Sequence, residues 1–139
     1  MTTTKGEMSQ PKDYKMIVEK DVWIPLRDGT RVCADIFRPD SSREKFPVIM
    51  SLGPYMKDKL WVPPPDLDEK PNPYMNWETV NPEWWCPRGY AMLRVDTRGS
   101  GKSPGKSEPS SYQESLDAYD CIEWVAKQPW CSGEVGTCG

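Results

Sequence analysis

The residues with the most obvious chemical potential form a glycine-rich segment, Asp96–Ser103, which ends in Gly101-Lys102-Ser103. A Gly-Lys-Ser sequence after a strand is typical of loops that bind nucleotide phosphates. Such a loop has a glycine five residues before Gly101, where this chain has Asp96, whose carboxylate would repel phosphate. It also leads directly into a helix that binds the anion, whereas Pro104-Gly105 follows here. The sequence therefore favours a structural turn over nucleotide binding.

In this structural interpretation, Asp96 and Arg98 close a tight turn by pairing with each other or with nearby backbone. Gly99 and Gly101 supply backbone angles that other residues resist. Lys102 is then expected to be a solvated charge.

The absence of histidine limits the covalent chemistry that this chain can perform. A serine nucleophile needs a base within hydrogen-bond reach to take its proton. The serines fall on expected loops, turns, caps or a core strand, and no Ser-Xaa-Xaa-Lys sequence begins a helix. We therefore expect no esterase or peptidase activity from these 139 residues alone.

Other candidate ligands and acids have ordinary structural interpretations. The five cysteines lie far apart and lack the paired spacing of a zinc site, so we expect reduced, buried thiols. Asp117, Asp120 and Glu123 recur along one predicted helix, where they are expected to form a solvated face. We expect no cofactor and no metal.

Charge and hydropathy exclude several classes of partner. Lys and Arg number 18 against 21 Asp and Glu, well mixed along the chain, which argues against nucleic-acid and membrane binding. The apolar runs are too short to span a bilayer. Residues 1–15 are predicted to be a disordered polar tail without the apolar core of a secretory signal, so we expect a cytoplasmic protein.

The elements that must position any site follow from hydrophobic periodicity. Apolar residues alternate along 16–26 and again along 32–38, and the intervening Asp28-Gly29 is a strong turn signal, so an antiparallel hairpin is expected. The continuous apolar run 47–52 predicts a strand buried on both faces. Three further elements are predicted: strand 90–96, a helix from the capping box Ser111–Glu114 to Pro129, and a final strand ending near Gly139.

A proline- and tryptophan-rich segment, residues 56–80, lies between the predicted strands 47–52 and 90–96. So long an irregular segment is usually functional, often a lid or pocket wall. Asn81-Pro82 then begins a short helix that Gly89 ends. Four tryptophans in and after this segment are expected to pack it onto the domain, in preference to lining an acyl or proline-sized pocket: Trp61, Trp77, Trp84 and Trp85.

The order of hairpin, strand, short helix, strand, helix and strand predicts an α/β fold. Buried strands that alternate with helices form parallel sheets through right-handed crossovers. An antiparallel hairpin that leads into a mostly parallel sheet is typical of the N-terminal portion of an α/β-hydrolase, here incomplete.

Six segments together resemble one family, the cocaine-esterase and X-prolyl dipeptidyl-peptidase type of serine hydrolase. The resemblance runs from about Val18 to the last residue. Its segments are Val22–Thr30, Gly53-Pro54-Tyr55, Asn81–Trp85, Arg88-Gly89-Tyr90, Asp96–Ser103 and Trp130–Gly136.

The resemblance implies an α/β-hydrolase domain over residues 16–139, with small-molecule ester, amide or peptide substrates that include X-Pro bonds. It implies that Tyr55 donates its hydroxyl to the oxyanion, and its place after a buried strand agrees. It also implies that Gly139 begins the turn of the serine nucleophile. The nucleophile, acid and base would then be absent from this chain, which is expected to be an inactive fragment whose final strand lies at the sheet edge. The alternative is a short non-catalytic binding or scaffold protein that uses the Trp/Pro-rich segment.

Overall fold

A computed structural model describes residues 14–68 and 70–139 of the chain. Residues 1–13 of the predicted polar tail lie outside this part. Tyr14 packs edge-on against Phe46 with 5.1 Å between ring centroids. The carbonyl oxygen of Lys15 accepts a 2.7 Å hydrogen bond from the amide of Asp40. The chain is therefore attached to the sheet from Tyr14 onward.

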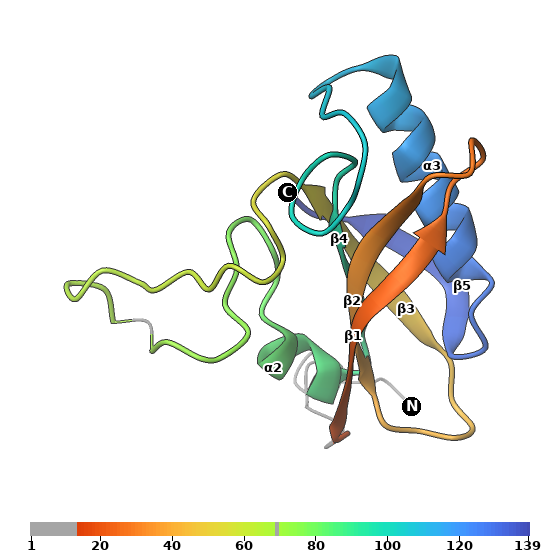
Figure 1. Cartoon of the computed structure of the whole chain (residues 1–139). Helices are drawn as coiled ribbons and strands as arrows, with labels where there is room; N and C mark the ends of the chain where they lie inside the picture. Colours follow the sequence, from red (N-terminus) through yellow and green to blue (C-terminus); the bar gives the residue numbers. More distant parts are fainter. Residues whose placement is uncertain (1–13, 69) are drawn as a thin grey trace.

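The described residues form a mixed five-stranded sheet in the order β1-β2-β4-β3-β5 (Figure 1). Strands β1 (Met16–Pro25) and β2 (Arg31–Pro39) form an antiparallel hairpin, and β2 pairs antiparallel with β4 (Ala91–Asp96). Strand β3 (Phe46–Gly53) pairs parallel with both β4 and β5 (Cys131–Thr137). The predicted α/β architecture, an antiparallel hairpin leading into a mostly parallel sheet, is confirmed.

The helices begin where the sequence signals lie, although the helix expected to reach Pro129 ends earlier, at Ala126. The side chain of Asn81 accepts the amide of Glu83 at the start of α2 (Pro82–Trp85). The 3₁₀ helix η1 (Cys86–Arg88) then ends at Gly89, whose φ of 87° is left-handed. Ser111 Oγ accepts the amide of Glu114 at 3.1 Å to start α3 (Tyr112–Ala126).

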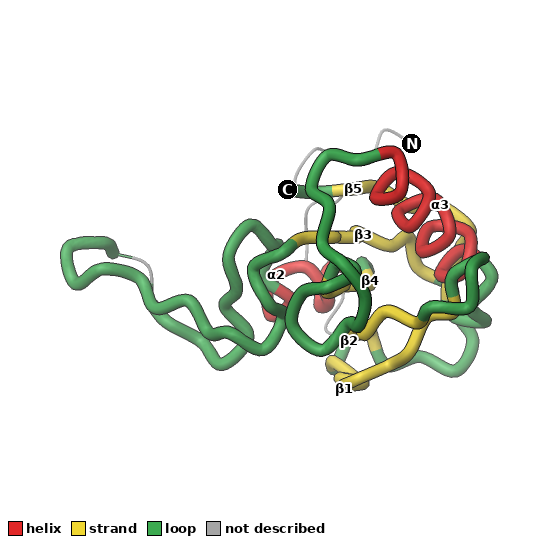
Figure 2. The backbone as a smooth tube through the Cα atoms, turned by 45° about the horizontal axis from the view of Figure 1, so that its top comes forward, coloured by secondary structure: helices red, strands yellow, loops and turns green. Residues whose placement is uncertain are grey.

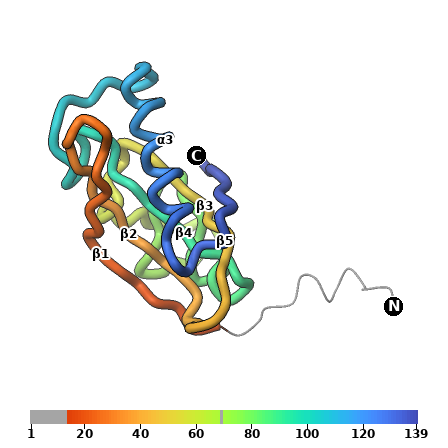
Figure 3. Tube along the Cα trace, turned by 90° about the vertical axis from the view of Figure 1, so that its right-hand side faces the viewer, coloured from red at the N-terminus to blue at the C-terminus, as the bar shows by residue number. Residues whose placement is uncertain are grey.

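The two faces of the sheet carry different layers. Helix α3 packs on one face, where Cys121 and Val125 join the apolar side chains of the central strands. Helix α2 and the long irregular segment lie on the opposite side (Figure 2). Phe37, Met92 and Cys86 form a second, smaller core there. In Figure 3, β5 runs beside α3, and β1 forms the other margin of the sheet. None of the described helices has the length and apolar character needed to cross a membrane.

A β-bulge interrupts the alternation expected along β1. The register shifts between Glu19 and Val22, and Asp21 adopts a positive φ of 55°. One extra residue turns the following side chains to the opposite face. Val18 therefore packs in the smaller core and Val22 in the larger one, although both occupy even positions. The sequence predicted one half-buried face along the whole strand. The bulge instead divides β1 into two parts whose apolar side chains point to opposite faces of the sheet.

The irregular segment after β3 projects from the sheet (Figure 1) and is held to β4 by a buried arginine. Arg94 donates to the carbonyl oxygens of Tyr74 at 3.0 Å and Val80 at 3.4 Å. Its guanidinium also lies 4.9 Å from the Phe37 ring centroid. Burial lowers the pKa of Arg94 to about 10, which still leaves the side chain charged at neutral pH.

Candidate functional site

The carboxyl ends of three parallel strands, β3, β4 and β5, meet at one edge of the sheet. Gly53 ends β3 and leads into Pro54-Tyr55, Asp96 ends β4, and Cys138-Gly139 follows β5. Open α/β sheets bind their ligands at this edge. These segments therefore define the candidate active site.

Tyr55 lies beside an open aromatic groove. Its side chain is 42% exposed, and its ring centroid is 6.5 Å from that of Trp77 in an edge-to-face arrangement. Trp77 in turn lies 5.9 Å from Trp61. The groove measures about 410 Å³ and is lined by Pro54, Tyr55, Met56, Lys59, Leu60, Trp61 and Trp77. Its walls are those of an apolar binding site.

The structure separates the four tryptophans that the sequence grouped. Trp61 and Trp77 line the groove beside Tyr55. Trp85 instead packs edge-on against Trp84 and Tyr90, and Arg88 stacks on Trp84 at 3.7 Å. The expected packing onto the domain describes Trp85, which packs against the smaller core, whereas Trp84 is 48% exposed.

A second, smaller cavity of about 20 Å³ connects Tyr55 with the end of the chain. Tyr55, Trp77, Cys138 and Gly139 are among its lining residues. The amide of Cys138 donates to the carbonyl oxygen of Met50 at 2.9 Å, which continues the pairing of β5 with β3. Gly139 therefore lies beside the Tyr55 loop.

Asp96 organises the glycine-rich loop from within. Its carboxylate accepts the backbone amides of Lys57 at 2.7 Å and Lys102 at 3.0 Å. Gly101 leaves room for it, because a Cβ there would lie 2.2 Å from Asp96 Oδ2. The amide of Lys102 in the Gly-Lys-Ser sequence thus binds an internal carboxylate. A structural turn closed by Asp96 and nearby backbone is what the structure shows.

Of the two expected ways to close this turn, pairing of Asp96 with Arg98 or with nearby backbone, Asp96 uses the second. Arg98 instead forms ion pairs with Asp117 at 2.9 Å and Asp28 at 2.7 Å. Lys102 is not simply solvated, since its Nζ lies 2.6 Å from Asp21 Oδ2.

The predicted solvated acidic face of α3 is likewise wrong for two of its three members. Asp117 is buried against Arg98, and Asp120 pairs with Arg27 at 2.7 Å. Glu123 is exposed as expected. Charged partners on loops far apart in the sequence therefore dock this helix to the sheet.

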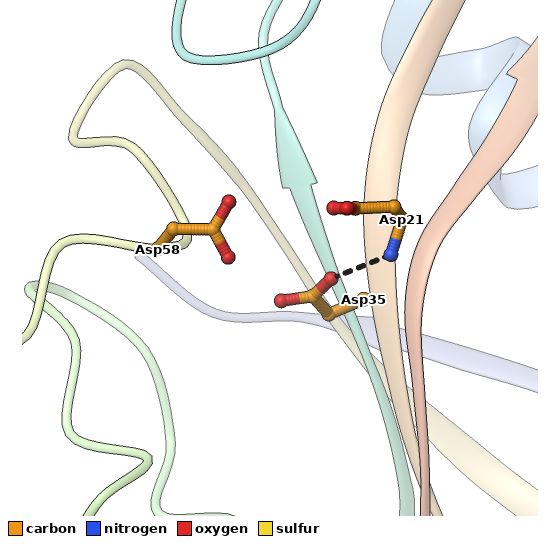
Figure 4. Close-up of side chains that lie close together, drawn as sticks. All are labelled: Asp21, Asp35 and Asp58. Atoms are coloured by element: carbon orange, nitrogen blue, oxygen red, sulfur yellow. Dashed lines mark hydrogen bonds between the residues drawn. The ribbon is translucent and has the colours of Figure 1, made fainter.

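Three carboxylates meet next to the candidate site and form what we call the carboxylate cluster: Asp21, Asp35 and Asp58 (Figure 4). They come from the β1 bulge, from β2 and from the Tyr55 loop. Asp35 is fully buried and also accepts the amide of Asp21 at 3.0 Å. Sequence reasoning missed this cluster; its available signals were Lys20, which breaks the alternation of β1, and a charge at Asp35 within an apolar strand.

Lysine ammonium groups neutralise the cluster. Lys57 Nζ lies 2.7 Å from Asp21, 2.9 Å from Asp35 and 3.0 Å from Asp58. Lys20 reaches Asp35 and Asp58, and Lys102 reaches Asp21. One oxygen of each carboxylate lies within 4.8 Å of the others, a spacing at which three ligands could hold a metal ion. The lysine ammonium groups, however, already bind these oxygens in place of such a cation. We assign no metal to the cluster.

The ion pairs shift the pKa values of both partners. Burial alone would lower the pKa of Lys57, but hydrogen bonds to Asp21, Asp35 and Asp58 outweigh it and raise that pKa. Hydrogen bonds from Lys102 and then Lys57 lower the pKa of Asp21. Lys57 and Asp21 therefore stay charged at neutral pH, and the cluster acts as a structural ion-pair network.

The fold is that of the N-terminal portion of an α/β-hydrolase. A CocE/NonD family hydrolase from Staphylococcus aureus superposes with a TM-score of 0.79 and 40% identity, over 89% of this chain and 23% of that one. An α-amino acid ester hydrolase shares the fold with a TM-score of 0.65 and 22% identity, over 92% and 22% of the two chains.

Sequence comparison then gives the family. Residues 28–139 match the X-Pro dipeptidyl-peptidase (S15) family, and the chain belongs to it. The chain is 33% identical over 129 residues to the cocaine esterase of Rhodococcus sp. (strain MB1 Bresler), covering 91% of this chain and 20% of that protein. A putative Xaa-Pro dipeptidyl-peptidase of Bacillus anthracis is 32% identical over 136 residues, covering 81% and 23%. The predicted resemblance is confirmed, and the chain spans about a fifth of the length of these curated relatives.

Proposed function

We propose that this chain is the N-terminal part of a serine hydrolase that cleaves ester, amide or peptide bonds, X-Pro bonds among them, through an acyl-enzyme. The observation that carries the proposal is that Tyr55 and Gly139 border one cavity at the carboxyl edge of parallel strands. A serine two residues beyond Gly139 would follow a residue that borders the same cavity as Tyr55. Membership of the S15 family supports the class of reaction.

In the proposed reaction, the serine oxygen adds to the substrate carbonyl carbon while a base takes the serine proton. The carbonyl oxygen becomes an oxyanion, to which the Tyr55 hydroxyl donates a hydrogen bond while keeping its proton. Collapse of the adduct releases the alcohol or amine, which receives the proton, and water then releases the acid by the same steps. A donor aimed at the oxyanion accelerates the reaction because the charge develops only in the transition state.

The aromatic groove beside Tyr55 is the proposed place for the apolar part of a small-molecule substrate. Trp77 is 48% exposed there, and aromatic walls bury apolar groups well. The same exposed surface favours the second candidate function, a non-catalytic binding protein that uses the Trp/Pro-rich segment.

The 139 residues alone are proposed to be inactive, because they hold no histidine to act as the base. The purified chain should not hydrolyse a chromogenic acetyl ester above the rate of its Tyr55→Phe variant. Hydrolysis that depends on Tyr55 in the 139-residue chain would overturn this part of the proposal.

The reading frame downstream of the Gly139 codon tests the two candidate functions against each other. The hydrolase proposal predicts an open frame with serine at the second codon, and covalent labelling of that serine by a fluorophosphonate in the full-length product. A stop codon directly after Gly139 would contradict the hydrolase and favour the binding protein.

A further inference from the structure

We propose that the buried ammonium group of Lys57 is a positioning group for Tyr55. By pairing with the carboxylate cluster it fixes the turn that aims the Tyr55 hydroxyl, and it acts through Tyr55 without touching substrate. The inference rests on the oxyanion role proposed for Tyr55.

The turn between these two residues has an unfavourable backbone conformation. Met56 has a positive φ of 64°, which residues with a side chain rarely adopt. Such a conformation persists only where the surrounding structure imposes it, and it is frequent at functional sites. The direction in which Tyr55 leaves β3 therefore depends on contacts that hold the turn.

Two side chains anchor the peptide group that follows Met56. Its amide, that of Lys57, donates to Asp96 Oδ1 at 2.7 Å, which ties the turn to the end of β4. Its carbonyl oxygen, that of Met56, accepts from Asn76 Nδ2 at 2.9 Å, and Asn76 Nδ2 also donates to the carbonyl oxygen of Lys59 at 2.9 Å. The Met56–Lys57 peptide group is thus held on both sides by side chains from other segments.

The Lys57 side chain supplies the third anchor, and its environment is what singles it out. Its side chain is 0% exposed, and all three carboxylates of the cluster lie within 3.0 Å of Nζ. Two of those carboxylates, Asp21 and Asp35, belong to the β1–β2 hairpin, which is part of the sheet. The ammonium group therefore fastens the Tyr55 loop to a rigid element two strands away from β3.

Lys20 provides a matched control within the same cluster. Its Nζ pairs with Asp35 at 2.5 Å and Asp58 at 2.6 Å, but its side chain is 51% exposed and it lies on β1. Removing Lys20 takes one positive charge and one exposed contact with Asp58 from the cluster, but it leaves the three buried contacts of Lys57 in place. If the Lys57 and Lys20 variants differ in kcat, the difference therefore reports on the positioning of the turn and not on the net charge of the cluster.

The test uses the full-length product of the reading frame and four variants: Lys57→Met, Lys20→Met, Tyr55→Phe and the Lys57→Met/Tyr55→Phe double variant. We expect Lys57→Met to lower kcat about tenfold to a hundredfold with little change in KM, because a misplaced donor is lost mainly in the transition state. The double variant should be no slower than Tyr55→Phe alone. Lys20→Met should retain kcat.

Amide hydrogen exchange of the peptide 53–60 provides a readout that does not need activity. Exchange should accelerate in Lys57→Met and stay unchanged in Lys20→Met. Asn76→Ala, which leaves no buried charge unpaired, should also accelerate exchange and lower kcat, and it carries the test if Lys57→Met does not fold.

The outcomes separate this inference from the proposed function. A normal kcat in Tyr55→Phe contradicts the oxyanion role. If Tyr55→Phe is slow, two results would overturn the positioning role alone. One is unchanged amide exchange in both Lys57→Met and Asn76→Ala. The other is a double variant in which the losses of kcat from the two single variants multiply.

Discussion

Arg98 holds the carboxylate of Asp117 through two hydrogen bonds of 2.9 Å, one from Nε to Oδ2 and one from Nη2 to Oδ1. The pair joins the loop after β4 to the first half of α3, and the side chain of Asp117 is 5% exposed. A third bond, from Nη1 to Asp28 at 2.7 Å, extends the link to the β1–β2 turn. A single guanidinium therefore docks a helix, a loop and a hairpin to one another.

Breaking this pair should destabilise the protein strongly. Asp117→Ala leaves the Arg98 charge without its bidentate partner, and loss of one member of a buried ion pair costs about 3–5 kcal/mol. Glu123→Ala, an exposed position on the same helix, should change the free energy of unfolding by less than about 0.5 kcal/mol. Urea denaturation of both variants measures the difference, and equal midpoints would contradict the docking role.

The turn residue Asp28 should make stability depend on pH. Hydrogen bonds from Arg98 and then from the Thr30 amide lower its pKa from 3.8 to about 2. Because the pKa is lower in the folded state, the contribution is present above about pH 4 and is lost as pH falls towards 2. Asp28→Asn should weaken the fall in urea midpoint between pH 5 and pH 2.5. An unchanged slope would show that this ion pair does not contribute.

Much of the fold could be predicted from local signals, because those signals act over a few residues. Asp28-Gly29 predicts the hairpin turn, and Asn81 and Ser111 predict where their helices begin. The partners of charged side chains could not be predicted in this way. Lys57 and Asp21 lie 36 residues apart, and only the bulge, which turns Asp21 with a positive φ, brings them together.

In the candidate site, too, some features could be predicted from local sequence signals and others depend on contacts between distant segments. Tyr55 could be singled out from the sequence because it follows a buried strand and matches a family segment. Its contact with Trp77 depends on how residues 56–80 fold back, which Arg94 and Asn76 determine through hydrogen bonds to backbone carbonyls. No periodic pattern in that proline-rich segment carries this information.

Gly101 should tolerate a side chain much less well than Gly133, which also has a left-handed backbone conformation. In Gly101→Ala the new Cβ would lie 2.2 Å from Asp96 Oδ2, in addition to the cost of a φ of +53°. In Gly133→Ala, with a φ of +93°, no atom lies within 4 Å, so the backbone cost of about 1–2 kcal/mol stands alone. Gly101→Ala should lose about 1–3 kcal/mol more, as in overpacked cores. Equal losses in thermal or urea unfolding would show that the loop relaxes around the new methyl group.

The cysteines should differ strongly in how fast they react with thiol reagents. Burial raises the pKa of Cys86 and of Cys121 to about 12 and that of Cys33 to about 11, whereas Cys138 is exposed. Because the thiolate is the reactive form, the folded protein at pH 8 should react quickly with a disulfide reagent at Cys138 alone among these four. Mass spectrometry identifies the modified residue, and denaturation should make all four cysteines reactive. Rapid labelling of Cys33 would contradict the packing of β2.

The central claim, that Tyr55 supplies the oxyanion donor, is tested most directly by ester hydrolysis in the full-length product of the reading frame. Tyr55→Phe removes only the hydroxyl and should lower kcat about a hundredfold to a thousandfold, with KM nearly unchanged. Tyr112→Phe, on the exposed first turn of α3, should leave both constants as they are. A Tyr55→Phe enzyme with the same kcat as the parent would contradict the account.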